Sequence, residues 1–271
     1  MRPIILITGA SSGLGAAMAR RYANWATVYG TTRSDQQLDY CQTLQLEVTD
    51  QASVQTAIDK VIVQEGRIDV LINNAGIVLS GPSESTSMDA IVRQFEVNCF
   101  GVMRVTHQVL PWMRRQRSGL VLNIGSMAGS VPLPFRSHYA ASKAALESWA
   151  WGLRLELQPL SIGVCCVQAG DFRSGLSETG KLVFPDSPEN AENRRAYEPS
   201  CDRVIAKFIE EEGKGIEPAE IAIRLESIVR RHSVRHRFRP TVGPFGQRLL
   251  FNVRRFLPDS VLERIVSRLY F

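Results

Sequence analysis

Short hydrophobic runs alternate along the chain with longer segments in which apolar residues recur every three or four positions. The short runs predict strands at Ile4–Thr8, Thr27–Thr31, Thr43–Glu47, Val70–Asn73, Gly119–Ile124, Ile162–Val167 and Arg239–Val242. The periodic segments predict helices near 14–25, 51–65, 84–117, 138–158, 200–212 and 218–231. Strands separated by helices of this length form right-handed crossovers between parallel strands. The pattern therefore predicts an α/β, Rossmann-type, doubly wound parallel sheet with helices on both faces.

Residues 171–199 interrupt this alternation, because they hold two glycines, three prolines and little periodicity. The segment follows a predicted strand end, where ligands bind in folds of this kind, and long aperiodic loops inside a domain are often lids. We therefore expect one catalytic domain over 1–243, a substrate lid at about 171–199 and a helical C-terminal extension over 244–271. Five apolar residues of the lid suit the enclosure of an apolar substrate: Phe172, Leu176, Leu182, Val183 and Phe184.

Composition excludes several classes of protein. A chain of 271 residues that is 44% hydrophobic can bury a large core, as one α/β domain does. No run of about 18 apolar residues occurs, so we expect no membrane-spanning segment, and the first apolar run is too short for a signal peptide. The five cysteines lack metal-ligand spacing, and Cys165 and Cys166 lie within an apolar run. We therefore expect no metal site, buried thiols and a cytoplasmic location.

The net charge of +5 is concentrated near the C-terminus. Residues 230–271 hold ten arginines and two acids, a net charge of +8, which leaves −3 for residues 1–229. Pro258 and Asp259 suit the start of a last helix. Along it, apolar residues recur every four positions beside arginines, at Leu257, Val261, Ile265 and Leu269.

Two interpretations of this basic extension remain open. The helix either packs on the domain or on a partner subunit, or it lies in a membrane interface with its arginines on anionic lipid. Nucleic-acid binding is disfavoured, because the arginines lie on an appendage and no platform of stacking aromatic residues is visible.

The first predicted strand leads into a glycine-rich turn, ITGASSGLG at residues 7–15. Gly9, Gly13 and Gly15 allow a tight turn and a close approach of the backbone to a pyrophosphate at the start of the next helix. Ser11, Ser12 and Leu14 complete the expected contacts. The spacing differs from the common Gly-x-Gly-x-x-Gly fingerprint, but its place after the first strand predicts a dinucleotide site.

The end of the second predicted strand indicates which dinucleotide is bound. Thr32 stands where an NAD site carries an acid, and Arg33 follows, a cation able to hold the 2′-phosphate of NADP. Asp35 is a rival ribose contact, but Ser34 and Gln37 fit a capping box that places Asp35 in the first turn of another helix. We therefore predict NADP(H) in preference to NAD(H).

Five short motifs follow one another in a fixed order and spacing: TGASSGLG at 8–15, NNAG at 73–76, VNCFG at 97–101, NIGSMAG at 123–129 and YAASK at 139–143. Together they resemble the short-chain dehydrogenase/reductase family over residues 1 to about 175. The cofactor pattern, the long lid and the extended tail resemble the subgroup that contains 17β-hydroxysteroid and retinol dehydrogenases.

The resemblance implies four catalytic residues, Asn98, Ser126, Tyr139 and Lys143. Tyr139 would exchange a proton with the reacting oxygen, and the Lys143 ammonium would favour the ionised phenol and bond the nicotinamide ribose. Ser126 would donate a hydrogen bond to the same oxygen. Asn98 would interrupt its helix and hold a water that relays protons to Lys143.

The resemblance also implies contacts along the adenosine half of the cofactor. Asn74, Ala75 and Gly76 would line this side. Glu47 stands where the family has an aspartate that contacts adenine, and Val48 keeps the next backbone position.

On the nicotinamide side, the stretch after the sixth predicted strand departs from the family pattern. Ala169 replaces a proline, whereas Gly170 remains. Ser174 stands where a threonine would bond the carboxamide, and Phe172 lies in the same loop. A hydroxyl is therefore kept at this position.

The family acts on many alcohols and ketones, so the fold does not name a substrate. The apolar lid favours hydride transfer between NADP(H) and a lipophilic ketone or secondary alcohol, steroid-like or retinoid-like. Two alternatives stay open: a reductase of 3-ketoacyl groups on an acidic carrier protein, which the basic tail would attract, and a non-catalytic NADP(H)-sensing regulator. The resemblance also suggests a homodimer or homotetramer.

Overall fold

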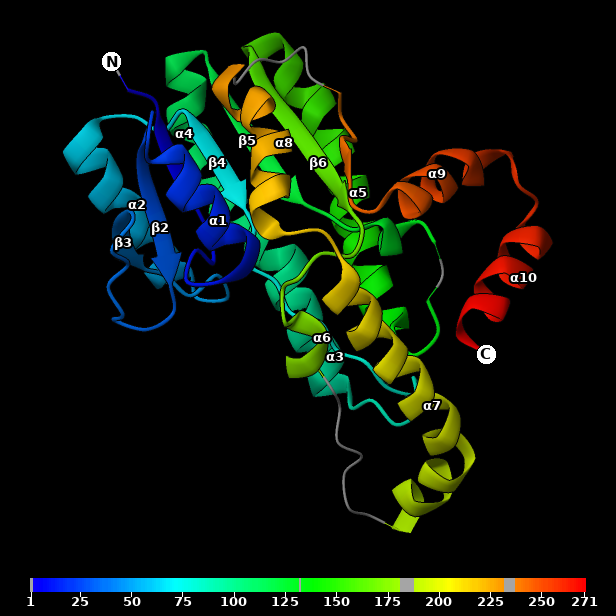
Figure 1. The fold of residues 1–271 in the computed structure, drawn as a ribbon. Coiled ribbons are helices and arrows are strands. Elements are labelled where there is room, and N and C mark those ends of the chain that lie inside the picture. Colours follow the sequence, from blue (N-terminus) through cyan, green and yellow to red (C-terminus); the bar gives the residue numbers. More distant parts are fainter. Residues whose placement is uncertain (1, 132, 181–187, 232–236) are drawn as a thin grey trace.

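Four of the hydrophobic runs are buried along their whole length and form the middle of a parallel sheet. They are β1 (Ile4–Ile7), β4 (Val70–Asn73), β5 (Gly119–Ile124) and β6 (Ile162–Ala169). Strands covered by helices on both faces need apolar side chains in both directions, which is why these runs are continuous. β3 (Gln42–Gln45) mixes exposed and buried residues, as expected for an edge strand. The computed structural model describes residues 2–131, 133–180, 188–231 and 237–271 (Figure 1).

The described strands pair in the order β3–β2–β1–β4–β5–β6–β7, all parallel, with β2 at Thr27–Thr32 and β7 at Thr241–Val242. The chain winds outward from β1 to β3 and then crosses to β4 on the other side of β1. This reversal opens a crevice at the carboxyl ends of β1 and β4, where such folds bind ligands.

Helices cover both faces of the sheet (Figure 1). One face carries α1 (Gly13–Tyr22) and α8 (Pro218–Arg231), and the other carries α2 (Gln51–Glu65), α4 (Gly101–Gln116) and α5 (Ser137–Leu157). Alternate strand residues supply the two cores, with Ile5 and Ile7 on the α1 side and Ile4 and Leu6 on the α2 side. The predicted Rossmann-type fold is confirmed.

The single helix predicted at 84–117 is divided in three. Ser87 caps α3 (Met88–Phe95) by accepting a hydrogen bond from the Ala90 N–H at 3.2 Å, so the helix begins later than predicted. A π-helical turn at Glu96–Phe100 separates α3 from α4. Such turns insert an extra residue into a helix and are frequent at functional sites.

The prediction of a helix after β2 is wrong. Residues 33–41, all described, form a loop, so Ser34 and Gln37 make no capping box and Asp35 does not lie in a helical turn. The polar run SDQQ offers no apolar stripe to pack, and Leu38 is the buried side chain of this loop at 7% exposure.

The segment predicted as an aperiodic lid is partly helical. α6 (Leu176–Thr179) is short, and α7 (Pro188–Lys214) begins well before the predicted start at residue 200 and projects from the body (Figure 1). Pro199 lies inside α7. Leu182, Val183 and Phe184 fall outside the described residues.

Two helices form the C-terminal extension, α9 (Phe245–Val253) and α10 (Asp259–Tyr270). α10 begins after Pro258, as predicted. Its side facing the body carries Val266, which is buried, and Tyr270, whose ring lies 4.8 Å from that of Phe208 on α7. Of the predicted stripe, Leu257 and Ile265 are half-buried, whereas Val261 and Leu269 are 36% and 46% exposed, so the stripe is only partly covered by the body.

None of the described helices combines the length and the hydropathy needed to cross a membrane.

Candidate active site

The loops that follow β1, β4, β5 and β6 meet at a cavity of about 1820 Å³. Its wall includes every predicted catalytic and cofactor residue except Gly15 and Asn98, which lie behind it. The residues predicted from the sequence therefore converge on one place.

The glycine-rich turn after β1 depends on the absence of side chains. Gly9 and Gly13 have φ of +65° and +53°, a region that favours glycine. A Cβ on Gly15 would overlap the Gly9 carbonyl oxygen and the Asn74 amide. That amide donates to the carbonyls of Thr8 at 3.1 Å and Gly9 at 2.9 Å, which ties the turn to the end of β4.

The start of α1 fits a dinucleotide pyrophosphate. Among the described residues, Ser12 makes no side-chain capping bond and no acid occupies the first turn, so the N–H groups there keep their positive potential. Gly13 faces open space, because a Cβ placed on it would meet only the Ser174 carbonyl oxygen at 3.9 Å. Donors and room for an anion therefore coincide.

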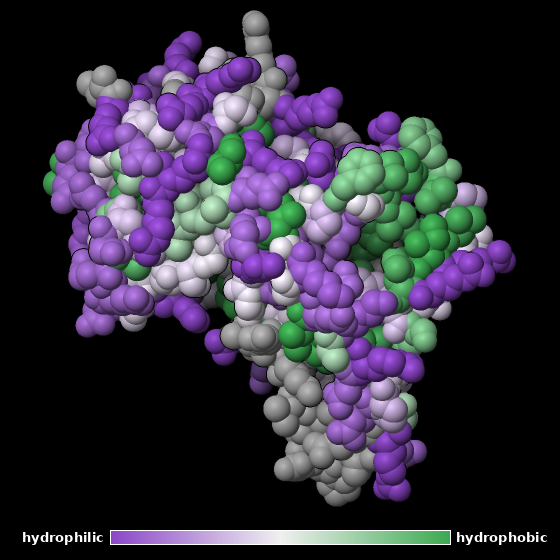
Figure 2. Space-filling model, viewed as in Figure 1, coloured by the Kyte–Doolittle hydropathy of each residue, from purple (hydrophilic) through white to green (hydrophobic). Residues whose placement is uncertain are grey.

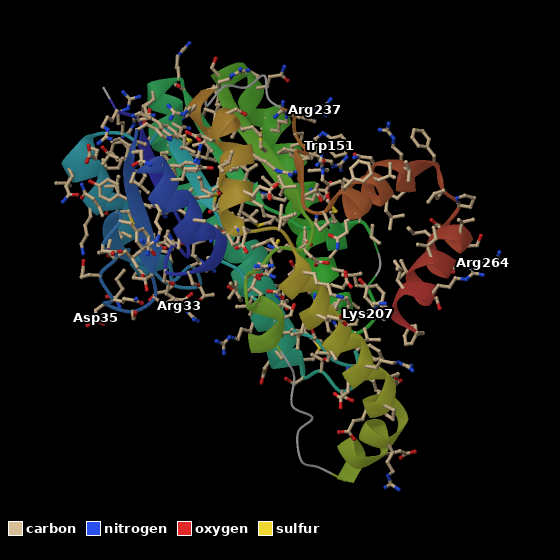
Figure 3. All side chains as sticks on the ribbon, viewed as in Figure 1. Arg33, Asp35, Trp151, Lys207, Arg237 and Arg264 are labelled. Carbon is tan, nitrogen blue, oxygen red and sulfur yellow. The ribbon has the colours of Figure 1, made fainter. Side chains whose placement is uncertain are left out.

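The adenosine end of the cavity carries one cation at the predicted position. Arg33 lies on the cavity wall and is exposed, whereas Asp35, farther along the same described loop, is not part of the wall (Figure 3). Glu47 is also on the wall, where its carboxylate accepts hydrogen bonds from the N–H and the hydroxyl of Thr49 at 3.1 and 3.0 Å.

Tyr139 and Lys143 lie one turn apart on α5 and share its cavity side. The Lys143 ammonium donates to the Ile124 carbonyl at 2.9 Å and lies 5.9 Å from the centre of the Tyr139 ring. Lys143 is only 7% exposed, whereas Tyr139 is half-buried. A buried cation is thus held beside a phenol that faces the cavity.

Ser126 follows β5 and caps the short 3-10 turn Met127–Gly129. Its hydroxyl oxygen accepts a hydrogen bond from the Ala128 N–H at 3.1 Å. Because this contact uses a lone pair, the hydroxyl proton remains available to an acceptor in the cavity.

Asn98 lies in the π-helical turn and is fully buried. Its side chain accepts from the Ile77 N–H at 2.9 Å and donates to the Ile77 carbonyl at 2.9 Å and to the Ser142 hydroxyl at 3.2 Å. These contacts hold the segment after β4 against α5. The Asn98 side chain thus supports the cavity wall without lining the cavity. The water relay predicted for Asn98 stays a prediction.

Glu212 on α7 holds the loop that follows β6. It accepts from the Ser174 hydroxyl at 2.5 Å and from the N–H groups of Ser174, Leu176 and Ser177 at 3.2, 3.0 and 2.9 Å. Burial opposes ionisation of Glu212, but these hydrogen bonds outweigh it and lower its pKa. The Ser174 hydroxyl donates its proton to Glu212. In the predicted contact with the carboxamide, Ser174 would therefore accept a hydrogen bond instead of donating one.

Arg136, a buried residue of the cavity wall that precedes α5, was not predicted from the sequence. Its guanidinium donates to the Ser80 hydroxyl at 3.0 Å and the Ser177 hydroxyl at 2.7 Å, and it lies 3.8 Å from the centre of the Phe208 ring. Burial lowers its pKa, and nearby acidic groups, among them Asp171, oppose this. Arg136 thus fastens α6 and α7 to the start of α5, and no sequence motif marks it.

The C-terminal extension also lines the cavity, which the sequence did not predict. Gln247 on α9 accepts from the Asp171 N–H at 2.8 Å and donates to the Asp171 carboxylate, next to Gly170. The apolar side chains that the extension adds to the wall include Leu250, Phe251, Val266 and Leu269. No motif in the sequence indicates this contact between the extension and the cavity.

Comparisons with known proteins agree with this geometry. The model of the short chain dehydrogenase family matches residues 3–181. The chain is 35% identical to a 3-ketodihydrosphingosine reductase of Bacteroides thetaiotaomicron over 273 residues, covering 100% of this chain and 99% of the relative. It is 36% identical to human 17-beta-hydroxysteroid dehydrogenase type 1 over 195 residues, which span 65% of this chain and 59% of the human protein.

Among solved structures, a short-chain dehydrogenase from Streptomyces avermitilis superposes with a TM-score of 0.78 at 29% identity. The match covers 98% of this chain and 95% of that one. The cofactor turn, the cavity and these matches identify the chain as an oxidoreductase that belongs to the short-chain dehydrogenase/reductase family.

Proposed function

We propose that the enzyme transfers a hydride from NADPH to the ketone of a lipophilic, long-chain substrate. One observation carries the proposal: the cavity that joins the cofactor turn to Tyr139 is walled at its other end by apolar residues of the C-terminal extension. The extension is included in the match to the 3-ketodihydrosphingosine reductase, which spans the whole of this chain.

The reaction needs a hydride, a proton and a polarised carbonyl. Bound NADPH supplies the hydride to the carbonyl carbon. The Ser126 hydroxyl donates a hydrogen bond to the carbonyl oxygen, where negative charge develops. Tyr139 gives its phenolic proton to that oxygen, which completes the alcohol. The Lys143 ammonium stabilises the phenolate that remains, and it would also hold the nicotinamide ribose of the bound cofactor.

The apolar wall of the cavity favours this substrate class over the acyl-carrier alternative. Its apolar residues suit a free lipophilic ketone that is buried in the cavity. The basic extension would also suit an acidic carrier protein, so turnover of the two substrates decides between them.

NADPH consumption on matched substrates tests the proposal. We expect a long-chain 3-ketone dispersed in detergent to have a kcat/KM at least about tenfold above that of a short-chain homologue, because each buried methylene contributes about 0.8 kcal/mol. Equal values for the two ketones, or a preference for the ketoacyl group on its carrier protein, would refute the lipophilic substrate. Tight NADPH binding without turnover on any ketone would favour the sensing regulator.

Arg33→Asp is expected to shift cofactor preference from NADP(H) toward NAD(H). The cation that would hold the 2′-phosphate becomes an acid that repels it and can bond the ribose hydroxyls instead. A charge-assisted hydrogen bond contributes about 1.5–3 kcal/mol, so the ratio of kcat/KM values should change by roughly tenfold or more. Asp35→Asn, on the same loop but off the cavity wall, is the matched control and should leave the ratio unchanged. Unaltered selectivity in Arg33→Asp would remove Arg33 from the phosphate site.

The proposal includes a homodimer or homotetramer located in the cytoplasm, with peripheral membrane contact through 244–271. Exposed apolar residues on neighbouring helices support self-association: Phe100, Trp151 and Leu155 are 46%, 48% and 62% exposed.

A further inference from the structure

α9 presents apolar side chains on two sides. Its inner side lines the cavity. On its outer side Phe245, Leu249 and Val253, spaced four residues apart, are 76%, 52% and 37% exposed, and Phe256 continues the line at 72%. We call these four residues the outer ridge. An exposed row of large apolar side chains is usually covered by a partner molecule or a membrane. We therefore expect a binding partner to cover the outer ridge.

The surroundings of the outer ridge are basic. The extension holds five arginines against Asp259 and Glu263. Arg255, Arg264 and Arg268 are exposed, whereas Arg248 and Arg254 are partly buried. Arg255 lies over the Phe256 ring at 4.6 Å. Figure 2 shows hydrophobic surface over α9 and the start of α10 with hydrophilic side chains at its edge, and Arg264 points away from the body there (Figure 3).

The positive charge around the outer ridge distinguishes two possible binding partners, a second copy of the chain and a lipid bilayer. A second copy of the chain that met the outer ridge about a twofold axis would bring the arginines of both extensions together, with two acids per chain to offset them. A bilayer with anionic headgroups complements both features, because the apolar side chains insert while the arginines meet the phosphates.

We propose that the outer ridge docks the enzyme on an anionic lipid bilayer. Leu249 on the ridge and Leu250 on the cavity wall are consecutive residues of one helix. Docking specifies the surface for the membrane contact proposed above for 244–271, and it does not depend on the proposed ketone reduction. It places the wall of the substrate cavity next to the bilayer from which a lipophilic ketone would come, and this second step rests on the proposed ketone reduction.

Sedimentation with lipid vesicles tests the docking without any substrate. The vesicles are phosphatidylcholine alone or phosphatidylcholine mixed with phosphatidylglycerol. We expect the wild type to partition at least about tenfold more strongly onto the mixed vesicles, and added salt to reduce this binding. Absence of binding to the mixed vesicles would overturn the proposal.

Variants locate the docking surface. Phe245→Ser with Leu249→Ser should lower binding to the mixed vesicles by at least about tenfold, because two large apolar side chains no longer insert. Val63→Ser is the matched control: Val63 is 86% exposed on α2, on the opposite side of the molecule, and this change should leave binding unaltered (Figure 1). Equal binding by the double variant and the wild type would overturn the proposal.

Turnover and oligomeric mass of the double variant distinguish lipid docking from self-association. Phe245 and Leu249 do not belong to the cavity wall formed by the described residues, so the double variant should keep its turnover of a detergent-dispersed ketone. A change of its oligomeric mass in sedimentation without vesicles would identify the ridge as an interface between copies and overturn the proposal. Ketone turnover without vesicle binding refutes the docking alone, and vesicle binding without turnover refutes the proposed function alone.

Discussion

Replacing Tyr139 with phenylalanine is expected to lower kcat for ketone reduction by about a thousandfold, while the dissociation constant of NADPH stays nearly unchanged. The substitution removes the phenolic proton donor that lies on the cavity wall beside the Lys143 ammonium, and general acid catalysis typically contributes 10²–10⁴-fold. The ring remains, so the shape of the wall is preserved. Steady-state kinetics and an NADPH fluorescence titration measure the two quantities.

Tyr197→Phe is the matched control for this substitution. Tyr197 on α7 donates to the Glu84 carboxylate at 2.9 Å and is not part of the cavity wall formed by the described residues. Removing its hydroxyl should leave kcat within about twofold of the wild type, because the contact is exposed. A Tyr139→Phe enzyme that keeps most of its turnover would contradict the acid–base role.

Lys143→Met is expected to lower both kcat and NADPH affinity, which distinguishes Lys143 from Tyr139. Loss of the ammonium removes stabilisation of the phenolate and also a charge-assisted hydrogen bond to the cofactor ribose, worth about 1.5–3 kcal/mol or roughly 10–100-fold in affinity. The NADPH titration should therefore show weaker binding in this variant and not in Tyr139→Phe. Unchanged NADPH affinity would remove Lys143 from the ribose contact.

The same substitution has a structural cost that must be measured beside its activity. The Ile124 carbonyl loses the partner that it has at 2.9 Å, and an unsatisfied buried acceptor costs about 1–3 kcal/mol of unfolding free energy. Kinetics are therefore compared below the melting temperature of the variant. Lys60→Met, on the exposed side of α2, controls for loss of a lysine and should change neither quantity.

The sequence predicted the site residues best where they belong to the strand ends or to the turns that directly follow the strands. The turn after β1 requires a positive φ at positions 9 and 13. Glycine is the residue that adopts it readily, so the glycines in the sequence predict the turn. The residues that end β4, β5 and β6 reach the cavity because parallel strands present their carboxyl ends at one edge. These local and topological rules account for the convergence of the predicted site.

Predictions failed where tertiary contacts override local pattern. Ser34 and Gln37 match a capping box, yet their loop is held by the buried Leu38 and by the hydrogen bond that its N–H donates to the Thr43 hydroxyl at 2.8 Å. The helix predicted to begin near residue 200 begins at Pro188 instead, and α7 runs through Pro199.

The contacts that complete the cavity are long-range and carry no motif. Arg136 meets Ser177 across 41 positions, and Asp171 meets Gln247 across 76. Periodicity along one segment cannot show which distant segment it packs against. This is why the role of α9 in the cavity wall was visible only in the structure.

Transfer of deuterium tests the central claim most directly. The enzyme is given NADPH deuterated at the hydride that it transfers, together with a long-chain 3-ketone, and the alcohol is analysed by mass spectrometry. We predict a single deuterium on the carbinol carbon with the wild type, and none above background in the same time with Tyr139→Phe. A wild-type enzyme that forms no alcohol, or an alcohol without the label, would contradict hydride transfer from NADPH to the ketone.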